Sequence, residues 1–293
     1  MRGVRVGVLG GSGLYDLPGL SETEQVPVTT PFGDPSDVYV RGNLGGVEVF
    51  FLARHGRGHR LMPTELNYRA NIYGFKQLGV EWVIAVSAVG SLREDLAPGH
   101  LCIPDQFYDN TRHRPLTFYG EGVVVHVAMA DPVCPHLCDL LASSAERLGA
   151  TVRKGGTYLC IEGPQFSTRS ESLIYRQWGV DVIGMTNMPE AKLAREAEIC
   201  YATLAMVTDY DCWHESEASV DVDQILRVLQ QNAMTAQAII AEMLPRIKPL
   251  RTCPCARALE NAILTNPASI PFVRRQQLDL LLGPYLRTRE GDR

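Results

Sequence analysis

The sequence predicts a single α/β domain with a central mixed, largely parallel twisted sheet flanked by helices. Short β-rich apolar runs alternate with amphipathic, helix-like segments, and such βαβ units require parallel strands. Glycine-rich or polar clusters follow several of these runs, which is where α/β folds bind ligands. The chain has 293 residues, of which 45% are hydrophobic, enough for one large domain or two modest ones.

The first apolar run, Val4–Leu9, is predicted to be a strand that ends in the turn Gly10–Gly13. This turn can aim backbone N–H groups and a hydroxyl at an anion, but a tight turn that needs positive φ would explain the glycines equally well. The pattern is not G-x-G-x-x-G, because Asp16 occupies the last glycine position. This departure argues against a dehydrogenase.

Two further strands, Asp37–Arg41 and Val47–Ala53, are predicted to form a hairpin through Gly42–Gly46. The second strand leads into a basic loop that begins with Arg54 and His55. Arg54 offers a fork of donors to an oxyanion, and His55 offers one more. A solvated basic loop is the alternative interpretation.

The remaining elements are predicted from hydrophobic periodicity and from helix stop signals. The predicted helices are Thr64–Leu78, Cys134–Leu148 and Asp221–Leu244, the last with Asp221 and Gln224 as a capping pair. The predicted strands are Val83–Ala88, Val123–Met129, Thr157–Ile161, Val180–Gly184 and Tyr201–Thr208.

The composition changes from Lys248 onward, where prolines separate short segments. Helical pieces are predicted at Arg257–Leu264 and Val273–Leu282. We interpret residues 248–293 as a C-terminal extension that packs on the domain, residues 1–247, or on a neighbouring subunit.

Composition and charge argue against several classes of function. The net charge of −5 gives no electrostatic reason to bind nucleic acid or an anionic membrane. No apolar run has the length of a membrane span, and no signal peptide is expected. Eight cysteines, mostly inside apolar runs, are typical of reduced thiols in a cytoplasmic protein. Cys253-Pro-Cys255 is too short for the paired-ligand pattern of a zinc site, so no metal site is predicted and a redox role stays open.

The stretch Cys160–Trp213 is the most informative part of the chain. It holds three polar signatures that follow apolar runs, namely Cys160–Glu171, Gly184–Ala191 and Thr208–Trp213. Because the carboxyl ends of parallel strands meet at one edge of a sheet, we expect these signatures to form the walls of one pocket.

Together with the glycine turn and Arg54-His55, these signatures resemble the trimeric purine nucleoside phosphorylase family. The resemblance covers about Val4 to Ile247. The matching motifs, in chain order, are Gly10–Leu14, Leu52–Gly56, Gly90–Glu94, Ile161–Pro164, Met185-Thr186 with Pro189-Glu190, and Thr208–Trp213. The resemblance implies the fold of that family.

The resemblance also implies a reaction, in which phosphate attacks C1′ of a purine nucleoside and the base leaves. Such an enzyme is a pentosyltransferase, with inorganic phosphate as co-substrate and without metal or organic cofactor. The branch of the family that this chain is most similar to acts on 5′-methylthioadenosine, in purine and methionine salvage, and 5′-deoxyadenosine is a plausible second substrate. A homotrimer or a dimer of trimers is implied.

For phosphate, the positions that match the family are Ser12, Arg54, His55, Ser87 and Thr186. Neutral hydroxyl and backbone donors with one arginine would hold the nucleophile without suppressing its reactivity. Relatives often have threonine at the positions of Ser12 and Ser87, and the hydroxyl is retained here.

For the base, the matching positions are Phe166, Asp209 and Asp211, with Ala88 lining the floor. Asp209 would bond purine N7 as a neutral acid when the base departs, and Asp211 would accept from the 6-amino group. An ionised carboxylate only accepts hydrogen bonds, so it suits an amino group and opposes a 6-oxo group. The pair is therefore expected to select adenine. In isolation, solvated carboxylates in an Asx-type turn would be the alternative.

For the sugar, Met185 matches the residue under the ribose. The 5′ substituent would lie against Val222, Ile225 and Leu226, although these residues also fit an ordinary core-facing helix stripe. His126 matches a residue that in relatives reaches the 5′ region of a neighbouring subunit.

Two alternatives remain open at this point. Asn187-Met188 departs from the residues common in adenine-specific relatives, and this leaves a purine nucleoside or methylthioinosine phosphorylase acting on 6-oxopurines as one alternative. The other is a non-catalytic nucleoside-binding protein on the same fold.

Overall fold

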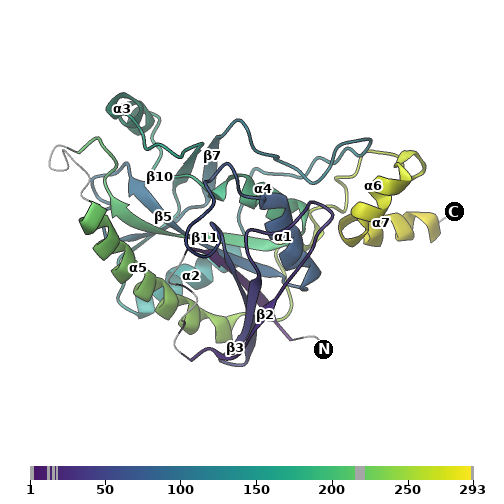
Figure 1. Cartoon of the computed structure of the whole chain (residues 1–293), viewed down its shortest axis with the longest axis horizontal. Helices are drawn as coiled ribbons and strands as arrows, with labels where there is room; N and C mark the ends of the chain where they lie inside the picture. The colour runs from purple at the N-terminus through teal and green to yellow at the C-terminus, as the bar shows by residue number, and fades with distance from the viewer. Residues whose placement is uncertain (1–2, 12–13, 15–16, 18, 215–221, 292–293) are drawn as a thin grey trace.

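A computed structural model of the chain describes residues 3–11, 14, 17, 19–214 and 222–291, and it describes only the backbone of 222–227, 229 and 288–291. The described chain forms a mixed sheet of eleven strands with helices packed on both faces (Figure 1). The predicted fold class, one α/β domain with a largely parallel sheet, is confirmed.

Four parallel strands form the centre of the sheet. They lie in the order β4 (Val47–Ala53), β1 (Arg5–Gly10), β5 (Trp82–Ser91) and β11 (Cys200–Asp209). The end of β5 also pairs, antiparallel, with β10 (Val182–Gly184). The sheet therefore branches at β5, and the carboxyl ends of its central strands meet at one edge.

Shorter strands extend this centre on both sides. The antiparallel strands β2 (Ser21–Val26) and β3 (Tyr39–Leu44) continue the sheet beyond β4. Beyond β10 lie β9 (Thr157–Ile161) and β7 (Gln106–Asn110), both parallel to their neighbours, and beyond β11 lie β6 (Leu101–Ile103) and β8 (Val152–Lys154).

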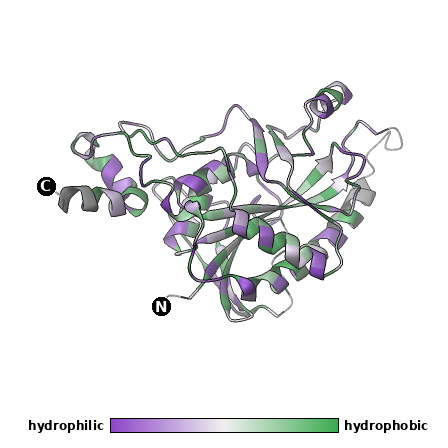
Figure 2. Cartoon of the chain, turned by 180° about the vertical axis from the view of Figure 1, so that it is seen from behind, coloured by the Kyte–Doolittle hydropathy of each residue, from purple (hydrophilic) through white to green (hydrophobic). Residues whose placement is uncertain are grey.

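Helices α1 (Tyr68–Gln77) and α4 (Asn187–Glu196) pack together on one face, whereas α2 (Pro135–Arg147) and α5 (Val222–Met243) pack on the other. Each face buries its own hydrophobic cluster, and Figure 2 shows hydrophobic stretches along the central strands beneath the helices. Alternate residues of β11 enter the two clusters, as the two-residue period of a strand requires. Helix α3 (Arg169–Gln177) lies at the end of the molecule opposite the C-terminus (Figure 1).

Most predicted elements are present with small shifts at their ends. The hairpin of β3 and β4 is confirmed, with a shorter turn at Gly45 and Gly46, both at positive φ. Helix α1 begins four residues later than predicted, because the side chain of Asn67 caps it by accepting a hydrogen bond from the Ala70 N–H at 3.1 Å. The predicted capping residue Asp221 lies outside the described residues.

Three predicted elements are wrong. Residues 123–129 form isolated bridges instead of a strand, since Val125 pairs singly with Ile263 of the tail. Where the helix Arg257–Leu264 was predicted, the 3₁₀ helix η2 (Pro254–Arg257) is followed by turns at 258–262 and by the bridge at Ile263. The predicted helix Val273–Leu282 is two helices, α6 (Phe272–Gln277) and α7 (Asp279–Gly291).

Hydrogen bonds hold the tail against the rest of the chain. Tyr73 of α1 donates to Gln277 O at 3.0 Å, and Arg274 donates to Phe118 O at 2.8 Å. None of the helices in the described chain is both long and apolar enough to cross a membrane.

Candidate active site

The carboxyl edge of the central strands opens on a cavity of about 1050 Å³. Nine of the residues predicted for the site line it together: Arg54, His55, Ser87, Ala88, Phe166, Met185, Thr186, Asp209 and Asp211. Ser12 lies outside the described residues, but Gly11 and Leu14 beside it line the cavity. The side chains of Val222, Ile225 and Leu226 are likewise not described. His126 is exposed and does not belong to the lining.

Asp209, the last residue of β11, forms an acidic pair with Asp211. The chain turns at Asp211, whose φ of 53° lies in the left-handed region that aspartate tolerates. This turn points the Asp211 N–H back at Asp209 Oδ1, at 2.7 Å. The hydroxyl of Thr208 lies 2.7 Å from the other oxygen, Asp209 Oδ2. The local backbone therefore fixes the orientation of Asp209.

Asp211 is the less solvated of the two acids, with 7% of its surface exposed. Its Oδ2 is buried and accepts no hydrogen bond from any residue that the structure describes. Burial raises the pKa of Asp211 to about 6, and the neighbouring Asp209 charge adds to this rise, whereas the Ser172 and Ser167 hydroxyls oppose it. A buried carboxylate oxygen without a partner at a cavity wall is what a ligand donor would satisfy.

Gly90, on β5, allows this acidic pair to approach the neighbouring strand. A Cβ at this position would lie 3.0 Å from Asp209 Oδ1 and 3.3 Å from Asp211 Cβ, and also 3.1 Å from Ile183. A side chain here would press on both acids, so the glycine is required by close approach and not by its backbone angle.

Arg54 lies at the floor of the cavity and is 2% exposed. Its Nε and Nη2 donate to the two carboxylate oxygens of Glu190, at 2.6 and 3.1 Å, while Nη1 donates to Val86 O at 2.8 Å and Nη2 to Leu9 O at 3.2 Å. The guanidinium fork was predicted to bind an oxyanion, but Glu190 occupies that fork. At most one N–H of Nη1 is left to face the cavity.

Glu190 is itself fully buried on α4 and also accepts from the Tyr201 hydroxyl at 3.0 Å. Asn187 donates to that same hydroxyl at 2.7 Å and is fully buried. Neither Asn187 nor Met188 lines the cavity. Asn187 therefore belongs to the support of Arg54 through Tyr201 and Glu190, whereas Met188 O accepts from Arg114, and neither residue forms a wall that would contact a base.

His55 is a neutral imidazole. Burial lowers the pKa of His55 to about 4, and the adjacent Arg54 charge also lowers it. The hydrogen bond to Leu61 raises the pKa but does not offset these two effects. Its Nδ1 lies 2.8 Å from Leu61 O, so Nδ1 carries the proton and Nε2 holds a lone pair. The sequence analysis treated His55 as a donor; the geometry makes its Nε2 an acceptor, which suits the hydroxyl of a hydrogen phosphate ion.

Two hydroxyls complete this end of the cavity. Ser87 lies on β5, with its Oγ 3.3 Å from the Tyr158 hydroxyl. Thr186 directly precedes α4, and its side chain does not cap the helix. Because the backbone of Met188 is extended, with φ −115° and ψ 128°, the regular part of α4 begins beyond that residue.

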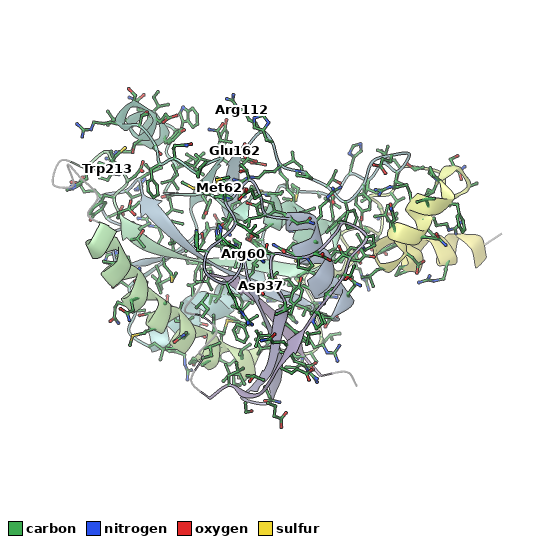
Figure 3. All side chains as sticks on the ribbon, in the orientation of Figure 1. Asp37, Arg60, Met62, Arg112, Glu162 and Trp213 are labelled. Carbon is green, nitrogen blue, oxygen red and sulfur yellow. The ribbon has the colours of Figure 1, made fainter. Side chains whose placement is uncertain are left out.

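Arg114 is a positioning residue that the sequence analysis did not identify. Its guanidinium is buried and donates to Met185 O, Met188 O and Glu162 O at 2.6, 2.7 and 2.8 Å, and it also pairs with the Glu162 carboxylate at 3.2 Å. It thereby joins the two loops that carry the second and first polar signatures. Figure 3 shows Glu162 beside Arg112. The Glu162 carboxylate also accepts a hydrogen bond from the Arg112 backbone N–H.

The remaining walls come from a loop and a helix. Arg60 and Met62 of the loop after β4 lie near the middle of the molecule in Figure 3, and both line the cavity. Arg60 is held there by a 2.8 Å bond to Ser36 O. Four residues of α5 line the opposite wall, Gln230, Ala233, Met234 and Gln237. Their spacing of three and four residues is that of one helix face.

Residues 5–245 match the model of the phosphorylase superfamily. The chain belongs to that superfamily. It is 58% identical over 282 residues to the S-methyl-5′-thioadenosine phosphorylase of Geobacter sulfurreducens, covering 96% of this chain and 99% of that one. It is 57% identical over 280 residues to the protein of that name from Koribacter versatilis, covering 96% of both.

Solved structures of the phosphorylase superfamily show the same fold. A methylthioadenosine phosphorylase from an antarctic soil metagenomic library superposes with a TM-score of 0.91 at 48% identity, over 96% of this chain and 100% of that one. An adenosine/methylthioadenosine phosphorylase mutant from Schistosoma mansoni, in complex with methylthioadenosine, superposes with a TM-score of 0.79 at 38% identity, over 85% and 93% of the two chains.

The sequence signals for the missed residues of this phosphorylase differ in strength. Glu190 stands inside a motif that was recognised, but its pairing with Arg54, 136 residues away, has no local signal. Arg114 stands outside every motif, in a loop between β7 and α2. Its position next to the cavity depends on contacts between segments 48 to 74 residues apart, which no local pattern indicates.

Proposed function

We propose that this chain cleaves the N-glycosidic bond of 5′-methylthioadenosine with phosphate, giving adenine and 5-methylthioribose 1-phosphate. The observation that carries the proposal is the acidic pair Asp209 and Asp211 in one cavity with His55, Ser87 and Thr186. The names of the similar proteins support the same substrate. 5′-Deoxyadenosine is a plausible second substrate, since a methyl group fits where methylthio fits.

At the phosphate end, the neutral His55 Nε2 accepts a hydrogen bond from the hydroxyl of HPO₄²⁻, while the Ser87 and Thr186 hydroxyls donate to its oxygens. Ser12 is proposed for the same role. Arg54 acts there through its charge and through the one N–H that Glu190 and the two carbonyls leave. This arrangement orients the anion toward C1′ without surrounding it with cations, so the nucleophile stays reactive.

At the base end, Asp209 protonates or hydrogen-bonds N7 as negative charge develops on the leaving purine. The Asp211 carboxylate accepts from the 6-amino group, which supplies the partner that its Oδ2 lacks. Phe166 and Ala88 contact the ring. A 6-oxo purine would place an acceptor against this carboxylate, which disfavours the alternative substrates with that group.

The sugar is proposed to lie over Met185, with the 5′ substituent against Val222, Ile225 and Leu226. Phe166 and Met234 line the cavity and are 77% and 58% exposed. Apolar side chains this exposed at a cavity favour cover by a second copy of the chain. We therefore propose a homotrimer in which His126 of a neighbouring subunit reaches the 5′ end, and a cytoplasmic enzyme of purine and methionine salvage. The reaction so written needs no metal or organic cofactor.

The proposal is tested with a substrate panel. The full chain is incubated with 5′-methylthioadenosine, methylthioinosine or inosine, with and without phosphate, and the released base is quantified by chromatography. Adenine release is expected only with phosphate, and kcat/KM for the 6-oxo substrates is expected to be at least about 10-fold to 100-fold lower, since a lost charge-assisted hydrogen bond costs about 1.5–3 kcal/mol. Equal release without phosphate would identify a hydrolase, and binding without turnover would identify a nucleoside-binding protein.

Asp211→Asn isolates the amino-group contact. The raised pKa means that Asp211 is protonated below about pH 6, so kcat/KM of the unaltered enzyme for 5′-methylthioadenosine is expected to fall as the pH drops through about 6. The variant is expected to lose that limb of the profile and to lose most of the preference for amino over oxo purines.

Stability is expected to change in the opposite direction. The native carboxyl binds its proton more tightly than the unfolded one, so ionised Asp211 destabilises the fold at neutral pH and this cost disappears as the pH falls from about 6 toward the unfolded pKa. Asp211→Asn should therefore melt at the same or a higher temperature at pH 7. A variant that melts lower and keeps its selectivity would contradict the assignment.

A further inference from the structure

Four cysteines from three distant segments meet on the sheet face covered by α2. Cys134 directly precedes α2, Cys200 begins β11, and Cys253 and Cys255 flank Pro254 in the tail. All four are buried, and their Sγ atoms lie within 4.8 Å of one another. The cluster lies outside the cavity lining and has no part in the reaction proposed above.

The separation of the sulfur atoms suits a shared ligand. The sulfur atoms of Cys200 and Cys253 are 3.3 Å apart, far longer than the roughly 2.05 Å of a disulfide bond. A tetrahedral zinc ion with Zn–S bonds of about 2.3 Å places its sulfur atoms about 3.8 Å apart. The observed range, from 3.3 Å to less than 4.8 Å, includes that separation.

The surroundings also favour a charged cluster. Zinc with four thiolates carries a net charge of two minus, and burying such a charge requires a compensating cation. Arg195 of α4 is 8% exposed and brings Nη1 to 3.9 Å from Cys255 Sγ. A second bond, from its Nη2 to Asp131 O, fixes the guanidinium in this position.

Backbone hydrogen bonds within the domain hold Cys134 and Cys200 in place without any contribution from the tail. The Cys134 N–H donates to Tyr201 O at 2.8 Å, and the Cys200 N–H donates to Glu81 O at 2.9 Å. The tail is fixed next to them by Arg251, whose Nη1 donates to Glu198 O at 2.6 Å. The motif Cys253-Pro-Cys255 thus supplies half of a ligand set, and the other half is 53 or more residues away in the sequence.

We propose that Cys134, Cys200, Cys253 and Cys255 bind one Zn²⁺ ion as thiolates. Four protein ligands leave no open position, so the site is structural and ties the C-terminal tail to the sheet. Soft thiolate ligands in tetrahedral geometry select zinc over magnesium, calcium or manganese. The expectation that this protein holds no metal was based on the spacing of Cys253 and Cys255 alone, and it is revised here.

The test measures metal in the full chain, purified under reducing conditions without a chelator or an affinity metal. Elemental analysis is expected to give one zinc ion per chain. Cys255→Ser is expected to lose most of that zinc, while Cys102→Ser, which changes a thiol that is equally buried but lies outside the cluster, is expected to retain it. Cobalt(II) added to metal-free protein should give the intense visible bands of a tetrahedral thiolate site.

A second measurement keeps the proposal testable if Cys255→Ser does not fold. In the unaltered protein, zinc should protect these four cysteines from alkylation, as mapped by peptide mass, until a chelator is added. Metal-free protein that takes up neither zinc nor cobalt would overturn the proposal. So would stoichiometric iron, or an intact mass lower by two hydrogens for each disulfide formed among the four.

Discussion

Asp209→Asn is expected to lower kcat for 5′-methylthioadenosine by about 10²-fold to 10⁴-fold, the usual contribution of a general acid. The amide can still hydrogen-bond N7, so KM should change little. The amide cannot donate a proton to N7 as the N-glycosidic bond breaks, so adenine would depart unprotonated and is a poorer leaving group. Steady-state rates measured at saturating phosphate check this expectation.

The matched control is Asp34→Asn, the same chemical change at an exposed position outside the cavity. It should leave both kcat and KM unchanged. Because Asp209 accepts the Asp211 N–H, the variant could also move Asp211. An unchanged preference for amino over oxo purines would show that Asp211 is still in place. A kcat within about tenfold of the unaltered enzyme would mean that a hydrogen bond at N7 suffices and that Asp209 does not transfer a proton.

The sequence predicted the site best where polar residues follow apolar strands. Asp209, Asp211 and Thr186 stand at or just beyond strand ends, and parallel strands bring their carboxyl ends together whatever the distance in sequence. The central strands β1, β4, β5 and β11 were also predictable. Both faces of each strand are largely buried, so their sequences are mainly apolar.

The sequence could not show which partners the buried charges have. Arg54 was predicted to face the cavity, but its fork is occupied by a carboxylate 136 residues away. Arg114 had no recognisable motif because its acceptors are mostly backbone carbonyls, which every residue carries. Cys253-Pro-Cys255 was judged from its own spacing, although its neighbours in space are Cys134 and Cys200.

The elements that were missed carry weak local signals. Strand β2 has the sequence Ser-Glu-Thr-Glu-Gln-Val and is almost entirely exposed, so it shows no apolar alternation. Strands β6 and β8 have three residues each. Helix α3 was within reach, because Thr168 and Glu171 form a capping box that the sequence displays.

Glu190→Gln is expected to destabilise the protein by about 3–5 kcal/mol, the usual cost of leaving one partner of a buried ion pair uncompensated. Arg54 and Glu190 are 2% and 0% exposed, so water cannot replace the lost charge. Glutamine keeps the shape of the side chain, and the change therefore isolates the charge from packing. Chemical denaturation at one protein concentration measures the free energy of unfolding.

Glu48→Gln provides the comparison, since Glu48 pairs with Arg5 and Arg41 and all three side chains are partly exposed. The free energy of unfolding of that variant should fall by no more than about 1 kcal/mol. Adding Arg54→Met to Glu190→Gln should restore stability, because it removes the uncompensated cation, yet it should not restore phosphate affinity. A Glu190→Gln variant as stable as Glu48→Gln would mean that Arg54 finds another counter-charge, and it would return the guanidinium fork to the role of a direct phosphate ligand.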